Sequence, residues 1–210
     1  MKGEVIIYDA GLVEEGKPEV VDYIRIKIGD GETNVNNLPF FAGAGGAGAA
    51  IVCNFVGYEG DESGETDTAA WNAAMQELEE TGKKILILQG EIGYINEQHI
   101  NLNNLIIIGY NSGLDNGAAG PENDYITFIN FNNCVIFGGS YYAEASINFN
   151  NSEIYDATWN YVWSDALVTG NFKMINCIDA SNLTMEFKNC NQVIIKNSEL
   201  PSVYLGINSK

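Results

Sequence analysis

The sequence predicts an all-β protein in which short strands stack as a β-solenoid behind a capping helix, with a small β-rich module ahead of it. Three observations predict this class. A six-residue pattern recurs through the second half of the chain, an amphipathic helix precedes its first copy, and two-residue hairpin turns are nearly absent. A chain of 210 residues, 46% of them hydrophobic, can bury a core, so overall disorder is excluded.

We expect three regions in chain order. A β-rich module covers residues 1–41, a Gly/Ala-rich neck with an acidic turn covers 42–66, and the capped solenoid covers 67–210. The module holds two β-rich segments, "GEVIIYDAG" and "DYIRIKIGDGETNVNNLPFF". A domain of about forty residues rarely folds alone without disulfides, metals or partner chains, so we expect the module to oligomerise.

One stretch of this module, "IKIGDGETNVNNLPF", resembles a segment near the N-termini of bacteriophage tail fibres and other virion appendages. The family carries Asp where this chain has Asn37. The resemblance implies a module that attaches a fibre to the particle or to the preceding shaft. The residues that carry it are Ile28, Gly29, Asp30, Gly31, Leu38, Pro39 and Phe40.

The neck leaves two interpretations open. The run "AGAGGAGAA" suits a flexible linker, and its small side chains equally suit close packing of three chains about one axis, together with the following "IVCNFVGY". The next stretch, "EGDESGETD", carries five carboxylates without the alternating ligand spacing of a calcium loop. A solvated acidic turn is therefore the favoured interpretation.

A helix is predicted over "TDTAAWNAAMQELEETG", with Thr66 or Asp67 as N-cap and Gly82 as terminator. Its apolar residues fall at helical spacing on one face. Two strands around Gly90 and Gly93 follow in "KKILILQGEIGYI". The apolar face of the helix comprises Trp71, Ala74, Met75 and Leu78.

The repeat has the pattern apolar, any, apolar, any, Asn, and then a small or apolar residue. Alternation at period two predicts short strands, and Asn suits the corner after each strand because it tolerates positive φ. Stacked corners would align the amides as a ladder. The copies are "INLNNL", "INFNNC", "INFNNS", "FKMINC", "MEFKNC" and "VIIKNS", and the ladder residues are Asn104, Asn133, Asn151, Asn176, Asn189 and Asn197.

The spacing of the copies predicts how they stack. The copies that begin at Ile100, Ile129, Ile147, Phe172 and Val193 lie at unequal offsets that scatter around the length of one coil, with the Met185 copy on a second face. An antiparallel sandwich of short strands is the alternative. The solenoid is favoured because Asn-Gly occurs once, at Asn116-Gly117, inside a polar insertion and not between paired strands.

The stretch "DTAAWNAAMQELEETGKKILILQGEIGYI", followed by "INLNNLIIIG", resembles the start of the pectin-lyase-like right-handed parallel β-helix. Gln89 stands where that family carries proline before Gly90. The resemblance implies a right-handed parallel β-helix over the coils. It does not specify an activity, because lyases, hydrolases and non-enzymatic viral fibres share this fold.

An enzyme of this fold would cleave a polysaccharide. Elimination needs a basic residue, but the coils carry no arginine, and hydrolysis needs two facing carboxyl groups about 5 to 9 Å apart. We predict no catalytic residue. A cross-coil pair such as Asp156 with Asp179 is the alternative, and Glu153 and Asp165 are the remaining candidate acids.

The aromatic stretch "YDATWNYVWSD" has two interpretations. Tyrosine and tryptophan rings stack on sugars, and they also concentrate in subunit interfaces. Trp159, Tyr161 and Trp163 are therefore candidates for glycan binding or for an interface.

The charge balance limits the partners. With 28 acidic and 10 basic residues the surface repels nucleic acid and anionic lipid. No apolar run is long enough to span a bilayer and no signal peptide is expected. The four cysteines lack metal-site spacing and suit buried thiols, so neither a metal nor a cofactor is predicted.

Together these features predict a structural appendage of a tailed bacteriophage, located in the virion and made in the host cytoplasm. It would assemble as a homotrimer, attach to other virion structural proteins, and have host cell-surface polysaccharide as a candidate partner. The alternative is a tail-spike enzyme that cleaves that polysaccharide.

Overall fold

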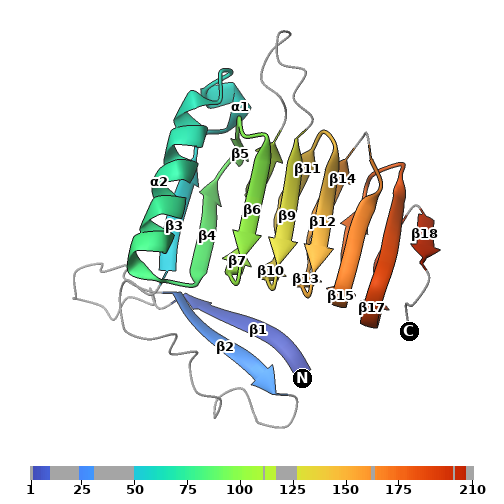
Figure 1. The fold of residues 1–210 in the computed structure, drawn as a ribbon. Coiled ribbons are helices and arrows are strands. Elements are labelled where there is room, and N and C mark those ends of the chain that lie inside the picture. Colours follow the sequence, from blue (N-terminus) through green and yellow to red (C-terminus); the bar gives the residue numbers. More distant parts are fainter. Residues whose placement is uncertain are drawn as a thin grey trace. The chain divides into compact units, whose positions relative to one another are not determined.

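The protein divides into two compact units, residues Met1–Ala50 and Ile51–Lys210, in a computed structural model (Figure 1). The structure describes residues 2–9, 24–30, 50–110, 112–116, 127–161, 164–200 and 202–206. The predicted boundaries at 41 and 66 differ from this division. Residues 51–66 were assigned to a neck, but they belong to the second unit because Ile51, Cys53 and Phe55 are buried in its core.

The described part of the first unit is a pair of strands. β1 (Lys2–Asp9) pairs antiparallel with β2 (Ile24–Asp30), with Tyr8 opposite Arg25. Both predicted β-rich segments therefore contain a strand. Of the attachment motif, Ile28, Gly29 and Asp30 lie at the end of β2, whereas Gly31, Leu38, Pro39 and Phe40 lie outside the described residues.

The second unit opens with β3 (Ala50–Phe55), α1 (Gly57–Gly60) and α2 (Glu65–Thr81). Helix α2 packs Trp71, Ala74 and Leu78 into the core, and Met75 is partly buried against it, which confirms the predicted apolar face. The helix ends where predicted, at Gly82 with φ of 65°. The predicted N-cap is wrong: the N-cap is Gly64, and Thr66 and Asp67 lie in the first turn.

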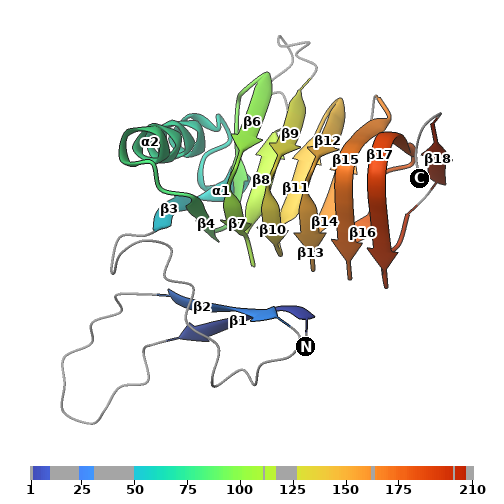
Figure 2. The same cartoon turned by 60° about the horizontal axis from the view of Figure 1, so that its bottom comes forward.

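The later strands fall into three sets, drawn together in Figure 2. The first set contains β6 (His99–Asn103), β9 (Phe128–Asn132) and β12 (Ser146–Asn150). The second contains β4 (Ile85–Gly90), β7 (Ile106–Ile108), β10 (Val135–Phe137) and β13 (Glu153–Tyr155). The third contains β5 (Ile92–Tyr94), β8 (Gly113–Asn116), β11 (Ser140–Ala143), β14 (Thr158–Tyr161) and β16 (Ile178–Asp179). Strands β15 (Ala166–Ile175) and β17 (Thr184–Lys196) run through the first and second sets, and β18 (Ser202–Leu205) pairs with the start of β17.

The pairings described from β4 to β18 are parallel, and each strand from β4 to β12 pairs with the strand three places later. After β12 the interval is two places, as in β13 with β15, β14 with β16 and β15 with β17, because β15 and β17 each run through two sets. This excludes the antiparallel sandwich for the second unit. Ile147 lies opposite Ile129, and Met185 lies opposite Ala166, so these copies of the repeat lie side by side on neighbouring parallel strands. The longer interval between Ile100 and its partner Ile129 includes the polar insertion.

Three of the repeat copies belong to a different set from the one predicted. Phe172 and Val193, which are partners in β15 and β17, lie in the second set, while Met185 lies in the first with the copies at Ile100, Ile129 and Ile147. The pattern missed the first-set copy at Ala166 because this copy is followed by Gly170 instead of asparagine. The first-set copies therefore begin at Ile129, Ile147, Ala166 and Met185, and the intervals between them are shorter and more regular than the interval from Ile147 to Phe172.

The corners of the second unit form two columns of positive φ, where Asn and Gly are the residues that adopt this conformation at least cost. One column follows the first strand set and the other follows the second set. The first column contains Asn104, Asn133, Asn151, Gly170 and Asn189, and the second contains Gly138, Asp156, Asn176 and Asn197.

One continuous core lies between the strand sets and α2. Inward positions alternate with outward ones, so Ile129, Phe131, Ile147 and Phe149 are almost fully buried. Aromatic rings contact one another along this core: Phe131 and Phe149 stack with centroids 5.4 Å apart, and Phe149 and Phe172 lie tilted with centroids 5.2 Å apart. In the described part of the chain no helix has the length and apolar character needed to cross a membrane.

Candidate functional site

The outer side of β6, β9 and β12 carries six asparagine side chains, two on each strand. We call these six residues the amide face. The alternation that turns Ile and Phe inward turns the residues between them outward, because successive side chains of a strand point to opposite sides. The strand register places these amides in two rows, one above another across the three strands. The amide face consists of Asn101, Asn103, Asn130, Asn132, Asn148 and Asn150.

Hydrogen bonds connect the amides of each row. In the first row Asn130 Nδ2 donates to Asn101 Oδ1 at 3.0 Å, and Asn148 Nδ2 donates to Asn130 Oδ1 at 2.9 Å. In the second row Asn132 Nδ2 donates to Asn103 Oδ1 at 3.1 Å. These bonds restrict the rotamers of the outward side chains, so the face is ordered before any ligand binds.

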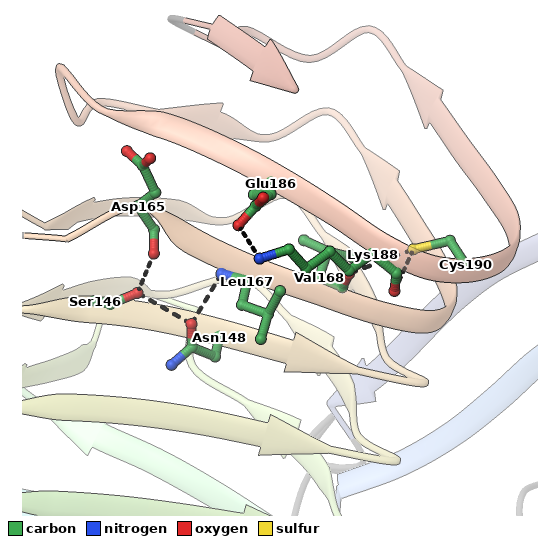
Figure 3. A network of polar contacts seen from close by, with 8 residues as sticks. All are labelled: Ser146, Asn148, Asp165, Leu167, Val168, Glu186, Lys188 and Cys190. Atoms are coloured by element: carbon green, nitrogen blue, oxygen red, sulfur yellow. Dashed lines mark hydrogen bonds and ion pairs between the residues drawn. The ribbon is translucent and has the colours of Figure 1, made fainter. Parts of the chain in front are cut away.

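The first row of amides ends at Asn148. Figure 3 shows Asn148 Oδ1 accepting from Ser146 Oγ at 3.0 Å and from the backbone N–H of Leu167 at 2.9 Å. The next strand of the first set, the start of β15, carries Leu167 and Thr169 at the matching outward positions, and Thr169 Oγ1 donates to Asn150 Oδ1 at 3.0 Å. An ion pair follows one strand further, on β17, with Lys188 Nζ 2.8 Å from Glu186.

No outward position of β6, β9 or β12 carries a carboxylate, lysine or arginine, although the whole chain has a net charge of −18. At one edge of the face the rings of His99 and Phe128 stack, with centroids 5.1 Å apart and planes 14° apart. His99 is exposed and Phe128 is half-buried. The site thus combines ordered amides with an accessible aromatic platform and carries no carboxylate, lysine or arginine.

The predicted asparagine ladder is present in part, at the corners. All six residues have positive φ, and Asn133 Nδ2 donates to Asn104 Oδ1 at 3.3 Å, as Asn197 Nδ2 does to Asn176 Oδ1. The six residues do not form one ladder, because they belong to two columns and other groups interrupt each. Asn151 Oδ1 accepts from the backbone of Asn171, and Asn176 donates to Asp156 Oδ1 at 3.0 Å.

The amide face was missed at the sequence level. The pattern treated its second and fourth positions as unrestricted, yet both are asparagine in the copies at Ile100, Ile129 and Ile147. The signal was present in the same six letters. Only the strand register shows that these positions lie one above another.

The two acids proposed as a cross-coil pair do not come together. Asp179 is buried and pairs in register with Trp159, and its carboxylate accepts from Tyr161 Oη at 3.1 Å and from the Ser181 N–H at 3.0 Å. Asp156 lies on the exposed second corner column, bonded to Asn176. Asp179 occupies an inward position and Asp156 an exposed corner, so the two carboxylates do not face one sugar. The alternative catalytic pair of Asp156 with Asp179 is therefore wrong.

The remaining candidate acids have other partners. Glu153 accepts from Tyr155 Oη and forms an ion pair of 3.4 Å with Lys173. Asp165 accepts the Thr184 N–H at 3.0 Å. A hydrogen bond with Glu153 adds to burial in raising the pKa of the Tyr155 hydroxyl. Each of these acids organises neighbouring strands of the second unit.

For two of the three aromatic candidates, the prediction that they bind a glycan or form an interface is wrong. Trp159 and Tyr161 are 1% and 0% exposed and belong to the core, because both occupy inward positions of β14. They offer no ring to a sugar or to a second chain. Trp163 lies outside the described residues.

The acidic turn before α2 contains one buried acid. Asp67 is 0% exposed, and its carboxylate accepts backbone N–H groups from Val56 at 2.8 Å, Gly57 at 3.0 Å and Tyr94 at 2.9 Å. Three donors from segments far apart in sequence satisfy the buried charge. The solvated-turn interpretation thus fails for Asp67, which connects β3, α1, α2 and β5.

The four cysteines are free thiols buried in the core, in agreement with the sequence prediction. Burial raises the pKa of the Cys177 thiol to about 11 and that of Cys53 to about 12. Cys134 Sγ donates to the Leu102 carbonyl at 3.3 Å. Within the described segments no three His, Cys, Asp or Glu side chains are placed to hold a metal ion.

Comparisons with protein-family models, characterised proteins and solved structures find no match to this chain.

Proposed function

We propose that the second unit is a right-handed parallel β-helix capped by α2, and that the protein is a structural appendage of a tailed bacteriophage. The observation that carries this proposal is the parallel stacking of strands that lie one repeat apart in the chain, with Ile129 beside Ile147 and Ala166 beside Met185. A stack of this kind is quasi-one-dimensional, because each coil contacts its neighbours. It suits a rigid spacer better than a deep active site.

The attachment role is proposed for the first unit. The motif that resembles virion appendages begins at the end of β2, which pairs with β1. Two strands alone make a marginal fold, so the module needs partner chains. Other virion structural proteins and further copies of this chain are the proposed partners.

A homotrimer is the proposed assembly. The outer side of the second strand set carries apolar residues in register, where Ile106 lies beside Val135 and Ile175 lies beside Tyr155, and it also carries the Glu153–Lys173 ion pair. The half-exposed members are Ile106, Val135, Ile175 and Ile194. Parallel strands that are apolar on both sides are usually covered on both sides. Two further copies of the chain would supply this cover.

Labelling of particles tests the proposal. Antibodies raised against the purified protein should decorate one end or vertex of the phage when imaged by electron microscopy, and light scattering should give the mass of three chains. A protein that stays monomeric and is absent from particles would contradict the proposal.

The enzyme alternative predicts a different result. Incubation with capsule or cell-wall polysaccharide should then release new reducing ends or unsaturated products. The structural proposal predicts neither, because the described candidate acids are bonded to neighbouring strands and one of them is buried.

A further inference from the structure

We infer that the amide face binds an uncharged polysaccharide, which gives the proposed appendage a defined host ligand. This inference rests on the proposed function and replaces Trp159 and Tyr161, which are buried. Its starting observation is a face of six asparagines in two rows, exposed or half-buried, on three parallel strands.

The amides retain hydrogen-bonding capacity toward a ligand. An asparagine side chain has two N–H donors and an oxygen with two lone pairs. The Asn130 amide donates one N–H to Asn101 and accepts one from Asn148, which leaves its second N–H for a ligand. Sugar hydroxyls both donate and accept, so they match a surface that offers donors and acceptors side by side.

The spacing of the amides is regular. Neighbouring strands lie about 4.8 Å apart and alternate residues of one strand roughly 6.7 Å apart, so the face is a fixed grid. The hydrogen bonds within each row hold the amides in place before binding, which lowers the entropic cost of binding. A polymer with repeating hydroxyls can contact both rows at several positions at once. A small polar molecule cannot do this.

The stacked rings of His99 and Phe128 supply the apolar contact that polysaccharides require. The rings are 5.1 Å apart at the edge of the amide face, and His99 is exposed. The C–H side of a sugar packs on an aromatic ring while its hydroxyls reach polar neighbours. Asn101 and Asn130 occupy the next outward positions along β6 and β9.

Charge selects the ligand class. A chain of net charge −18 repels acidic polysaccharides and nucleic acids at long range. The outward side of β6, β9 and β12 carries no lysine or arginine to offset this repulsion. A protein partner fits less well, because interface centres are enriched in aromatic residues, methionine and arginine, and this face offers one ring pair.

Native gels containing a soluble polysaccharide test the inference on the full chain. Dextran, yeast mannan and barley β-glucan serve as uncharged probes, and polygalacturonate serves as the acidic probe. Migration of the protein should slow with increasing concentration of at least one uncharged probe and should not change with polygalacturonate. No retardation by any uncharged probe, or retardation by polygalacturonate alone, would overturn the inference.

Variants locate the binding. Asn130→Ser and Phe128→Ser should each raise the half-saturating probe concentration at least fivefold. Asn160→Ser is the matched control, because Asn160 is a half-buried asparagine on β14 in the third strand set, and it should behave as the unmodified protein does. Equal retardation of all three variants would place the sugar elsewhere and contradict the inference.

Two further measurements keep the result interpretable. Asn103→Ser removes an exposed amide at the edge of the second row, so it tests the face if Asn130→Ser does not fold, and circular dichroism reports folding of each variant. Light scattering and particle labelling are done on the same protein. A trimer found on particles but without polysaccharide binding would refute this inference and leave the proposed function intact.

Discussion

Asparagine does two different jobs in this protein, and the backbone at each position decides which. At corners such as Asn104 and Asn133 its tolerance of positive φ matters most, with φ of 57° and 53°. On strands, at Asn101 and Asn130, the backbone is extended and the amides hydrogen-bond to each other along one row of the amide face. The two roles are adjacent in one six-residue motif, which is why the corner role alone was predicted.

Replacement of a corner asparagine should separate its backbone role from its side-chain role. Asn133→Ala should lower the free energy of unfolding by about 1–2 kcal/mol, because alanine is strained at positive φ. Asn133→Gly should cost less, since glycine adopts this conformation freely. Urea unfolding followed by circular dichroism measures both, and equal stability of the two variants would show that the amide bond to Asn104 matters more than φ.

Asp67 is the second residue whose role depends on burial. Asp67→Asn keeps the shape of the side chain but removes the carboxylate charge that accepts three backbone N–H groups. It also turns the N–H₂ group of the amide toward some of those donors. We expect a loss of about 3 kcal/mol in unfolding free energy, because hydrogen bonds to charged groups are strong and the donors are left buried.

The control for this variant is Glu65→Gln, an exposed residue of the same helical turn, which should change stability by less than about 0.5 kcal/mol. Equal urea midpoints for Asp67→Asn and Glu65→Gln would contradict the assigned role of Asp67.

At the scale of elements, α2 begins differently from the prediction because of a side chain outside it. The carboxylate of Asp61 accepts hydrogen bonds from Ser63 Oγ at 2.6 Å and from the Thr66 N–H at 2.7 Å. It therefore accepts from a first-turn N–H group that usually donates to the side chain of the N-cap residue. The Gly64 N-cap itself has no side chain to do so. Sequence rules place a cap next to the helix, and here the acceptor lies upstream of that position.

These bonds make the start of α2 sensitive to acid. The Ser63 side chain, followed by the Thr66 backbone, holds the pKa of Asp61 well below its usual range. A lowered folded-state pKa gives stability that is present above the ordinary aspartate value of about 3.9 and is lost as pH falls through the folded-state value.

NMR titration should therefore find Asp61 still ionised at pH 3, and amide exchange at Thr66 should quicken only below that pH. Glu65, exposed in the same turn, provides the comparison within one spectrum. An Asp61 that is already protonated at pH 3 would contradict this assignment.

At the scale of the whole molecule, the outer side of the second strand set is the proposed contact between copies. The inward residues of this set, Ile107 and Ile136, are fully buried in the core of the single chain, and its outward residues Ile106 and Val135 are apolar as well. Strands with apolar residues on both sides are usually covered on both sides. The outward row continues into the Glu153–Lys173 ion pair, so the apolar part of this surface lies on β7 and β10.

A charge on this outer surface should dissociate the proposed trimer. Ile106→Lys and Val135→Lys are expected to shift the mass measured by light scattering from three chains to one, because burying an unpaired ammonium group is costly. Thr158→Lys, at a half-exposed position of the third strand set, should leave the mass unchanged. A trimer that survives both substitutions on the second set would place the interface elsewhere.

The sequence by itself determined the local structure: strands from alternation at period two, corners from recurring asparagine, and α2 with its buried face and its end at Gly82. These follow from interactions within a few residues. Only the tertiary structure decided which copies share a strand set, that Trp159 and Asp179 point inward, that Asp67 collects three distant N–H groups, and that six asparagines form one face. The physical reason is that the register between parallel strands depends on contacts between residues far apart in the chain, and a shift of one position exchanges the inner and outer sides of a strand.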